Sequence, residues 1–156
     1  MKVDGACLCG YLSFEAEIDP EKVMMFHCTD CQNGAGAYRA GVLVNVEDFR
    51  LLSGTPKVYM KTSEAGGKRA LSFCPECGTN LHGANAEAPK TYSLRLGLVN
   101  QRRQLQPKLQ LWCRSALPWV FNLEQIPRSD TQPNVKLQAV CAALQSTPGI
   151  QITIRR

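Results

Sequence analysis

The segment that most constrains the fold is Cys74-Pro75-Glu76-Cys77-Gly78. A Cys-x-x-Cys turn followed by glycine brings two thiolates to one metal ion, and the glycine permits the left-handed backbone at the end of the turn. A structural zinc takes four ligands, so a second pair of cysteines is needed. Cys7 and Cys9 supply that pair from near the N-terminus. The predicted ligands of one structural zinc ion are therefore Cys7, Cys9, Cys74 and Cys77.

Length and composition set the class of protein. A chain of 156 residues with 44% hydrophobic content is long enough for one domain with its own core. No apolar run approaches a membrane span, and residues 1–9 lack the apolar centre of a signal peptide, so we expect a cytoplasmic protein. In a reducing compartment, paired cysteines are more often metal ligands than disulfides.

The charge pattern limits the partners. The net charge of +5 is scattered, and short arginine doublets stand at 102–103 and 155–156. These doublets are too sparse for a nucleic-acid surface, although they are compatible with small anionic substrates. We therefore expect neither nucleic acid nor membrane as a partner.

Hydrophobic periodicity predicts many short strands. Between Tyr11 and Ile18 apolar and polar residues alternate, which indicates a half-buried strand with Leu12, Phe14, Ala16 and Ile18 on one face. Further strands are predicted at 40–46, 51–52, 57–61, 69–73, 91–98 and 109–113. Many short strands with long-range ties indicate a mainly β domain of two packed sheets.

The C-terminal residues follow a different pattern. Apolar residues recur at helical spacing within Asn134–Gln145, and a last strand is predicted at 150–154. The helix would pack through Leu137, Val140, Cys141 and Leu144. We expect a zinc-binding domain over residues 1–125 and an addition over residues 126–156, a helix plus a strand, packed on it.

The remaining pair, Cys28 and Cys31, is where a function is expected. Once four thiolates bind a structural ion, these two form an incomplete site that keeps a place for water or substrate. A redox Cys-x-x-Cys motif is the alternative, but it opens a helix after a parallel strand, and no βαβ pattern surrounds this pair. His27 is either a ligand or, more in keeping with its position, a group that supports the ligands or faces solvent. Cys113 either packs in the core or faces this second site.

Together these motifs resemble the glutathione-dependent formaldehyde-activating enzyme family, which also includes centromere protein V. The resemblance is carried by Gly5-Ala6-Cys7-Leu8-Cys9-Gly10, Phe14-Glu15, His27-Cys28-Thr29-Asp30-Cys31-Gln32, Phe73-Cys74-Pro75-Glu76-Cys77-Gly78-Thr79-Asn80-Leu81 and Pro118-Trp119. It implies a β-tent fold of short antiparallel sheets, tied by a zinc ion on the first and last cysteine pairs. It also implies a second, catalytic zinc on a Cys-x-Cys-x-x-Cys run, and the addition of the glutathione thiol to formaldehyde, a carbon–sulfur lyase reaction.

This chain departs from that pattern at one ligand. Phe26 stands where the run has its first cysteine, so Cys28 and Cys31 remain as metal ligands and catalytic residues. Gln110 stands where relatives often carry histidine. The resemblance implies a zinc-dependent carbon–sulfur lyase-like enzyme that acts on a thiol adduct of a small aldehyde, with one structural zinc and a weak second zinc ion. The alternative is a zinc-stabilised binding or scaffolding module that has lost the chemistry.

Overall fold

The computed structural model describes residues 1–63 and 66–131. The helix predicted at Asn134–Gln145, the strand predicted at 150–154 and Cys141 lie outside the described residues. The chain divides into two compact units, Met1–Val120 and Phe121–Arg156. The sheets and both cysteine sites described below belong to the first unit.

A small antiparallel sheet contains the N-terminus. Its strands are β1 (Lys2–Ala6), β2 (Ser13–Glu17) and β5 (Phe49–Ser53), in the order β1-β2-β5. The predicted alternation around β2 is confirmed, because the side chains expected to face the core are all buried: Leu12, Phe14, Ala16 and Ile18.

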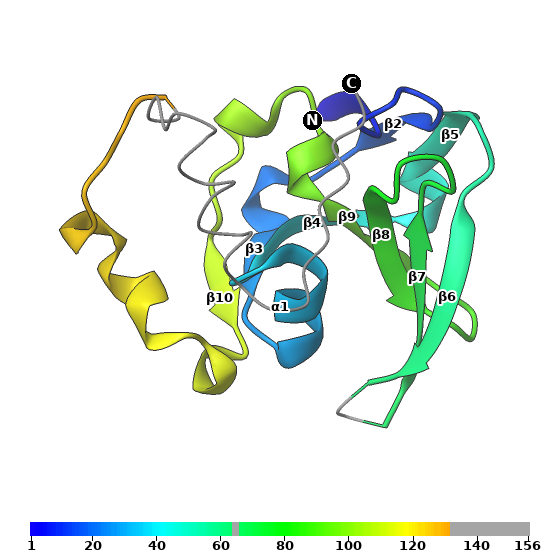
Figure 1. The fold of residues 1–156 in the computed structure, drawn as a ribbon. Coiled ribbons are helices and arrows are strands. Elements are labelled where there is room, and N and C mark those ends of the chain that lie inside the picture. The colour runs from blue at the N-terminus through cyan, green and yellow to red at the C-terminus, as the bar shows by residue number, and fades with distance from the viewer. Residues whose placement is uncertain (64–65, 132–156) are drawn as a thin grey trace, which may run out of the picture. The chain divides into compact units, whose positions relative to one another are not determined.

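A larger sheet has seven strands in the order β10-β3-β4-β9-β8-β7-β6 (Figure 1). In chain order they are β3 (Val23–Phe26), β4 (Arg39–Asn45), β6 (Lys57–Thr62), β7 (Lys68–Phe73), β8 (Asn80–Asn85), β9 (Thr91–Arg95) and β10 (Leu109–Leu111). Neighbours pair antiparallel except β10 and β3, which are parallel. The mainly β, two-sheet architecture expected from the periodicity is thus confirmed.

Several details differ from the predicted strands. β1 and β3 were not predicted, and the strand expected at 91–98 ends at Arg95, where the 3-10 helix η3 (Leu96–Leu98) begins. The strand expected at 109–113 ends at Leu111, and Cys113 lies in the 3-10 helix η5 (Cys113–Ser115). Turns of 3-10 helix keep apolar side chains directed inward, as the buried Leu96 shows, so an apolar alternation alone does not separate them from strand.

One α-helix lies among the described residues, α1 (Thr29–Ala35), and it was not predicted. The other helices are 3-10 turns: η1 (Pro20–Lys22), η2 (Val46–Asp48), η4 (Arg102–Gln104) and η6 (Pro118–Gln125), besides η3 and η5. No helix in the described part of the chain has the length and apolar character needed to cross a membrane.

The small sheet packs closely against η3 at Gly5. A Cβ atom on Gly5 would lie 2.2 Å from the carbonyl oxygen of Leu98, and Gly5 forms an isolated bridge with Val99. Only a glycine allows this approach of two backbones. The contact brings β1, and with it the loop that carries the first cysteine pair, against the segment that follows β9.

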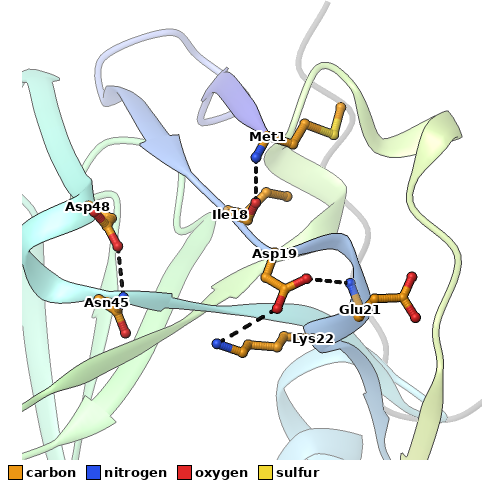
Figure 2. Close-up of polar contacts among 7 residues, drawn as sticks. All are labelled: Met1, Ile18, Asp19, Glu21, Lys22, Asn45 and Asp48. Atoms are coloured by element: carbon orange, nitrogen blue, oxygen red, sulfur yellow. Dashed lines mark hydrogen bonds and ion pairs between the residues drawn. The ribbon is translucent and has the colours of Figure 1, made fainter.

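Figure 2 shows how the chain turns between the two sheets. The side chain of Asp19 accepts a hydrogen bond from the Glu21 backbone N–H at 3.0 Å, which caps η1. Asp19 also forms an ion pair with Lys22 at 3.8 Å, and the Met1 ammonium group donates to the Ile18 carbonyl at 2.7 Å. The cap and the terminal hydrogen bond hold the exit of β2, from which the chain enters β3 and the second cysteine pair.

Candidate functional site

The first cysteine cluster forms where two loops meet. The turn between β7 and β8 carries Cys74 and Cys77, and the loop between β1 and β2 carries Cys7 and Cys9. The Sγ–Sγ distance is 3.5 Å for Cys7 and Cys9 and 3.8 Å for Cys9 and Cys74, and all four sulfurs lie within 4.8 Å of one another. A tetrahedron with Zn–S bonds of about 2.3 Å has edges of about 3.8 Å. The cluster predicted from spacing therefore forms, and its donor set fits a metal ion such as zinc.

Hydrogen bonds at this cluster favour the thiolate form of two of its cysteines, Cys7 and Cys77. The Leu12 backbone N–H donates to Cys7 Sγ at 3.2 Å, and the Thr79 hydroxyl lies 3.1 Å from Cys77 Sγ. The hydrogen bond from Thr79 lowers the pKa of Cys77 to about 5. Gly78 has a φ of 72°, the left-handed conformation expected for the glycine after the turn.

The second cysteine pair opens a helix. Cys28 is the N-cap of α1, and Cys31 lies in its first turn, with an Sγ–Sγ distance of 2.8 Å. Cys28 is half-buried and Cys31 is buried. Burial, followed by the hydrogen bond to Cys31, raises the pKa of Cys28 to about 11. This helix was missed in the sequence, but the chain continues into β4, which is antiparallel to β3, so the βαβ unit of a thioredoxin is indeed not formed.

Side-chain hydrogen bonds hold this pair in place. The Gln32 amide donates to the carbonyls of His27 and Ser115, both at 2.7 Å, which ties α1 to η5. His27 is fully buried, and its Nε2 lies 2.9 Å from Gln110 Oε1. The solvent-facing alternative for His27 is therefore wrong. Its ring is paired with Gln110, the residue that stands where relatives often carry histidine.

Phe26 makes a contact of its own where the resemblance implies a third cysteine. The guanidinium of Arg39 lies over the Phe26 ring, 3.9 Å from the ring centroid. Arg39 is fixed there by a 2.6 Å hydrogen bond to the Ser93 hydroxyl. A cation over an aromatic ring contributes about 0.5–2 kcal/mol, depending on how far it is desolvated. The Arg39 guanidinium and the Phe26 ring thus line the same cavity as the two cysteines.

A cavity of about 300 Å³ brings these groups together. It is lined by Phe26, Cys28, Asp30, Cys31, Arg39, Lys61, Ser63, Arg69, Leu71, Gly83, Arg95 and Trp112. Lys61 forms an ion pair with Asp30, whereas no carboxylate of the described residues pairs with the three arginines. Burial and the neighbouring Arg39 lower the pKa of Arg95 to about 10, while Cys31 and Cys28 act in the opposite direction. The cavity thus combines two sulfurs with an excess of positive charge.

The wall at Trp112 stores backbone strain. Trp112 has a φ of 62°, the left-handed region that a bulky residue rarely adopts. Such a conformation costs about 1–3 kcal/mol and is concentrated at functional sites. Cys113, the next residue, is exposed and does not line the cavity, so neither alternative considered for it, core packing or the second site, is correct.

A larger hollow of about 660 Å³ lies along the small sheet, lined mainly by acidic and basic side chains. Its acidic residues are Asp4, Glu15, Glu17, Glu47 and Asp48. It contains no cysteine or histidine, and Glu15 is already paired with Arg50 at 2.6 Å. We therefore place the candidate site at the smaller cavity, where nucleophilic and cationic groups converge.

The comparisons with known proteins agree with this arrangement of cysteines. The family model described as glutathione-dependent formaldehyde-activating enzyme matches residues 2–115, which include both cysteine sites. The chain belongs to the glutathione-dependent formaldehyde-activating enzyme family. A crystal structure of a Rhodobacter sphaeroides protein has a similar fold, with a TM-score of 0.54, 19% identity, and coverage of 70% of this chain and 99% of that one. No curated protein matches the chain in sequence.

Membership of the family confirms the resemblance drawn from the motifs. It also makes the departure at Phe26 specific to the second site, because all four cysteines of the first cluster are present and gathered. The three arginines were missed in the sequence. Arg39, Arg69 and Arg95 lie on β4, β7 and β9, so no local sequence motif predicts that they converge on one cavity.

Proposed function

We propose that this protein binds a small anionic thiol compound in the cavity beside Cys28 and Cys31 and serves carbon–sulfur bond chemistry on its adduct with a small aldehyde. The thiol and aldehyde named in the family description are glutathione and formaldehyde. The observation that carries the proposal is the convergence of two sulfurs and three arginines, which have no carboxylate partner among the described residues, on one cavity of about 300 Å³. That volume lies at the lower end of small-molecule sites.

The arginines supply the binding energy. A guanidinium removed from water without a counter-charge is costly, and a planar carboxylate relieves that cost through paired N–H···O hydrogen bonds. Arg39 is held by Ser93 and by the Phe26 ring, so it is oriented before a ligand arrives. A thiol compound bearing carboxylates would thereby be anchored with its sulfur near the cysteine pair. Holding thiol and aldehyde together raises the rate of their addition through proximity.

For the first cluster, we propose zinc as the ion. Four cysteine sulfurs at tetrahedral spacing form the donor set of a closed structural zinc site, which contributes folding energy and has no open position for substrate. The two sheets meet at this cluster because its cysteines come from the β1–β2 loop and the β7–β8 turn.

The second zinc implied by the family does not fit the residues present. Cys28 and Cys31 offer two sulfurs, and their 2.8 Å separation is shorter than the edge of about 3.8 Å that two ligands of one tetrahedral zinc require. Phe26 contributes no ligand atom. We therefore assign no chemical step to a second ion. The weak second zinc expected from the sequence would need a sulfur from outside the protein, such as that of the bound thiol.

A second candidate function follows from the same observation. With the third cysteine replaced and the ring covered by Arg39, the cavity is also suited to binding an anionic compound without transforming it. The protein would then be a zinc-stabilised binding module.

Three measurements test these two candidate functions. They are zinc titration with and without glutathione, glutathione binding, and turnover of glutathione with formaldehyde. We expect one tightly bound zinc per chain, glutathione binding that Arg95→Gln weakens, and zinc affinity at a second site that rises when glutathione is present. By linkage, zinc must then raise glutathione affinity by the same factor. Binding without turnover supports the binding module. Absence of glutathione binding would overturn the proposed function.

A further inference from the structure

We propose that Cys28 and Cys31 form a thiol–disulfide exchange centre that reacts with small anionic disulfides and closes to a reversible intramolecular disulfide. This activity goes beyond the proposed carbon–sulfur chemistry, because it transfers two electrons and needs neither an aldehyde nor a second metal ion.

The short distance between the two sulfurs supports disulfide formation. At 2.8 Å it lies between a disulfide bond of about 2.05 Å and the edge of about 3.8 Å found in a zinc tetrahedron. The sulfurs of the first cluster keep the wider spacing, with 3.5 Å between Cys7 and Cys9. The two cysteine pairs of this fold therefore differ in Sγ–Sγ distance, and the distance in the second pair is closer to the length of a disulfide bond.

The backbone of α1 also places the two cysteines next to each other. Cys28 and Cys31 sit at the N-cap and in the first turn of α1, and residues three apart on a helix are neighbours. The Gln32 amide fixes this turn by donating to the carbonyls of His27 and Ser115. The local turn and the Gln32 amide thus hold the two sulfurs in contact.

Unequal exposure gives the two cysteines separate roles. Both cysteines line the cavity, but Cys28 is half-buried whereas Cys31 is buried. An incoming disulfide therefore meets Cys28 first. Cys31 is positioned to attack the resulting mixed disulfide, because it already contacts Cys28 Sγ.

The exchange balances in two steps. In the first, the thiolate of Cys28, a minor form because burial raises its pKa, attacks one sulfur of the disulfide RS–SR, the S–S bond breaks, and one RSH leaves with the proton that Cys28 loses. In the second, Cys31 sulfur attacks Cys28 in the mixed disulfide, a second RSH leaves with the proton of Cys31, and the protein disulfide remains. The dithiol is oxidised by two electrons and RS–SR is reduced to two thiols, and the reverse reaction with two RSH restores the dithiol.

The charge of the cavity selects the class of disulfide. Its lining has four basic side chains, Arg39, Lys61, Arg69 and Arg95, against one acid, Asp30. A disulfide bearing carboxylates is attracted to this site, and a cationic disulfide of similar reactivity is repelled. Electrostatic steering of this kind changes association rates by about 10- to 1000-fold and weakens as salt is added.

The experiment uses the full-length, zinc-loaded chain with Cys113→Ser and Cys141→Ser, so that neither of the unpaired cysteines reacts. The protein is mixed at low salt with glutathione disulfide, with uncharged hydroxyethyl disulfide or with cationic cystamine. Peptide mapping by mass spectrometry locates disulfides, and zinc content reports whether the first cluster stays intact. We expect a Cys28–Cys31 disulfide that forms roughly tenfold or more faster with the anionic reagent than with the cationic one.

Two variants complete the design. Cys31→Ser should accumulate the mixed disulfide on Cys28, and Arg95→Gln should reduce the preference for the anionic reagent. Persistence of both free thiols, no mixed disulfide in Cys31→Ser, or equal rates with the three reagents would each overturn the proposal. These readouts need no glutathione–formaldehyde turnover and no second zinc, so they can fail or succeed independently of the proposed function.

Discussion

The two cysteine sites of this protein are built on opposite principles. In the first cluster, cysteines from distant segments lie at the spacing of a metal tetrahedron, with 3.8 Å between Cys9 and Cys74. In the second, two cysteines of one helical turn lie 2.8 Å apart and are held by hydrogen bonds from Gln32. The first arrangement has the geometry of a site that a bound ion would hold together, whereas the second is maintained by the backbone and one amide. In the proposed functions, the same residue type therefore serves architecture at one site and chemistry at the other.

The largest difference is expected when one cysteine of each site is replaced. The Cys74→Ser variant should be insoluble or poor in metal, because the binding energy of a structural zinc, about 10–16 kcal/mol in small zinc domains, is folding energy. A domain is stable by only about 5–15 kcal/mol, so a weakened zinc site is enough to unfold it. Zinc content and thermal unfolding of the purified variant measure this.

Cys28→Ser is the matched control for that change. It removes one thiol from the second pair and should leave one zinc per chain and a melting temperature within a few degrees of the wild type. A Cys74→Ser protein with full zinc content and an unchanged melting temperature would show that the first cluster does not hold the structural ion.

Phe26→Cys should bring the second site closer to the first. The new thiol would stand beside Cys28 and Cys31 and supply the third sulfur of the family's run, so zinc content should rise from one ion per chain towards two. Loss of the contact between the ring and Arg39 should cost about 0.5–2 kcal/mol of stability. Zinc analysis after dialysis and a denaturation curve check both expectations.

Phe26→Ser separates the two effects of that substitution, since it removes the ring without adding a sulfur. It should show the loss of stability and no gain of zinc. If Phe26→Cys also gained no zinc, the second pair could not be converted into a metal site by a third thiol. Zinc gained without turnover of glutathione and formaldehyde would favour the binding module.

The contrast also explains what the sequence could reveal. The first cluster was predictable because four-coordinate zinc demands a second pair wherever one Cys-x-x-Cys turn occurs, and Cys7 and Cys9 were available. The replacement at Phe26 was likewise visible, since it interrupts a motif of fixed spacing. Both inferences rest on local patterns with strict chemical requirements.

The rest of the second site depends on long-range packing. α1 contains Asn33 and Gly34, which have low helix propensity, and it is held by a hydrogen bond from Gln32 to Ser115, far along the chain. The arginines of the cavity lie on three different strands, and their convergence follows from a strand order that no single segment specifies. The sequence therefore named the two sulfurs of this site without revealing the charge around them.

The last of these effects, and the one most specific to the second site, concerns Gln32. Gln32→Ala removes two hydrogen bonds to part-buried carbonyls, which should lower the free energy of unfolding by about 1–3 kcal/mol and loosen the turn that carries Cys28 and Cys31. Gln101→Ala is the matched control, because Gln101 also makes two side-chain hydrogen bonds, both with Asp4 on the exposed surface.

Urea denaturation and the rate at which a thiol reagent labels Cys28 and Cys31 should separate these two variants. Gln32→Ala should lose more stability and react faster at the second pair, with zinc at the first cluster unchanged, whereas Gln101→Ala should change stability by about 0.5 kcal/mol and labelling not at all. Because Gln32 touches neither sulfur, faster labelling means that its amide holds the turn closed. Equal labelling in the two variants would instead show that the pair keeps its geometry without this amide, and the proposed contrast between an ion-held site and an amide-held site would have to be abandoned.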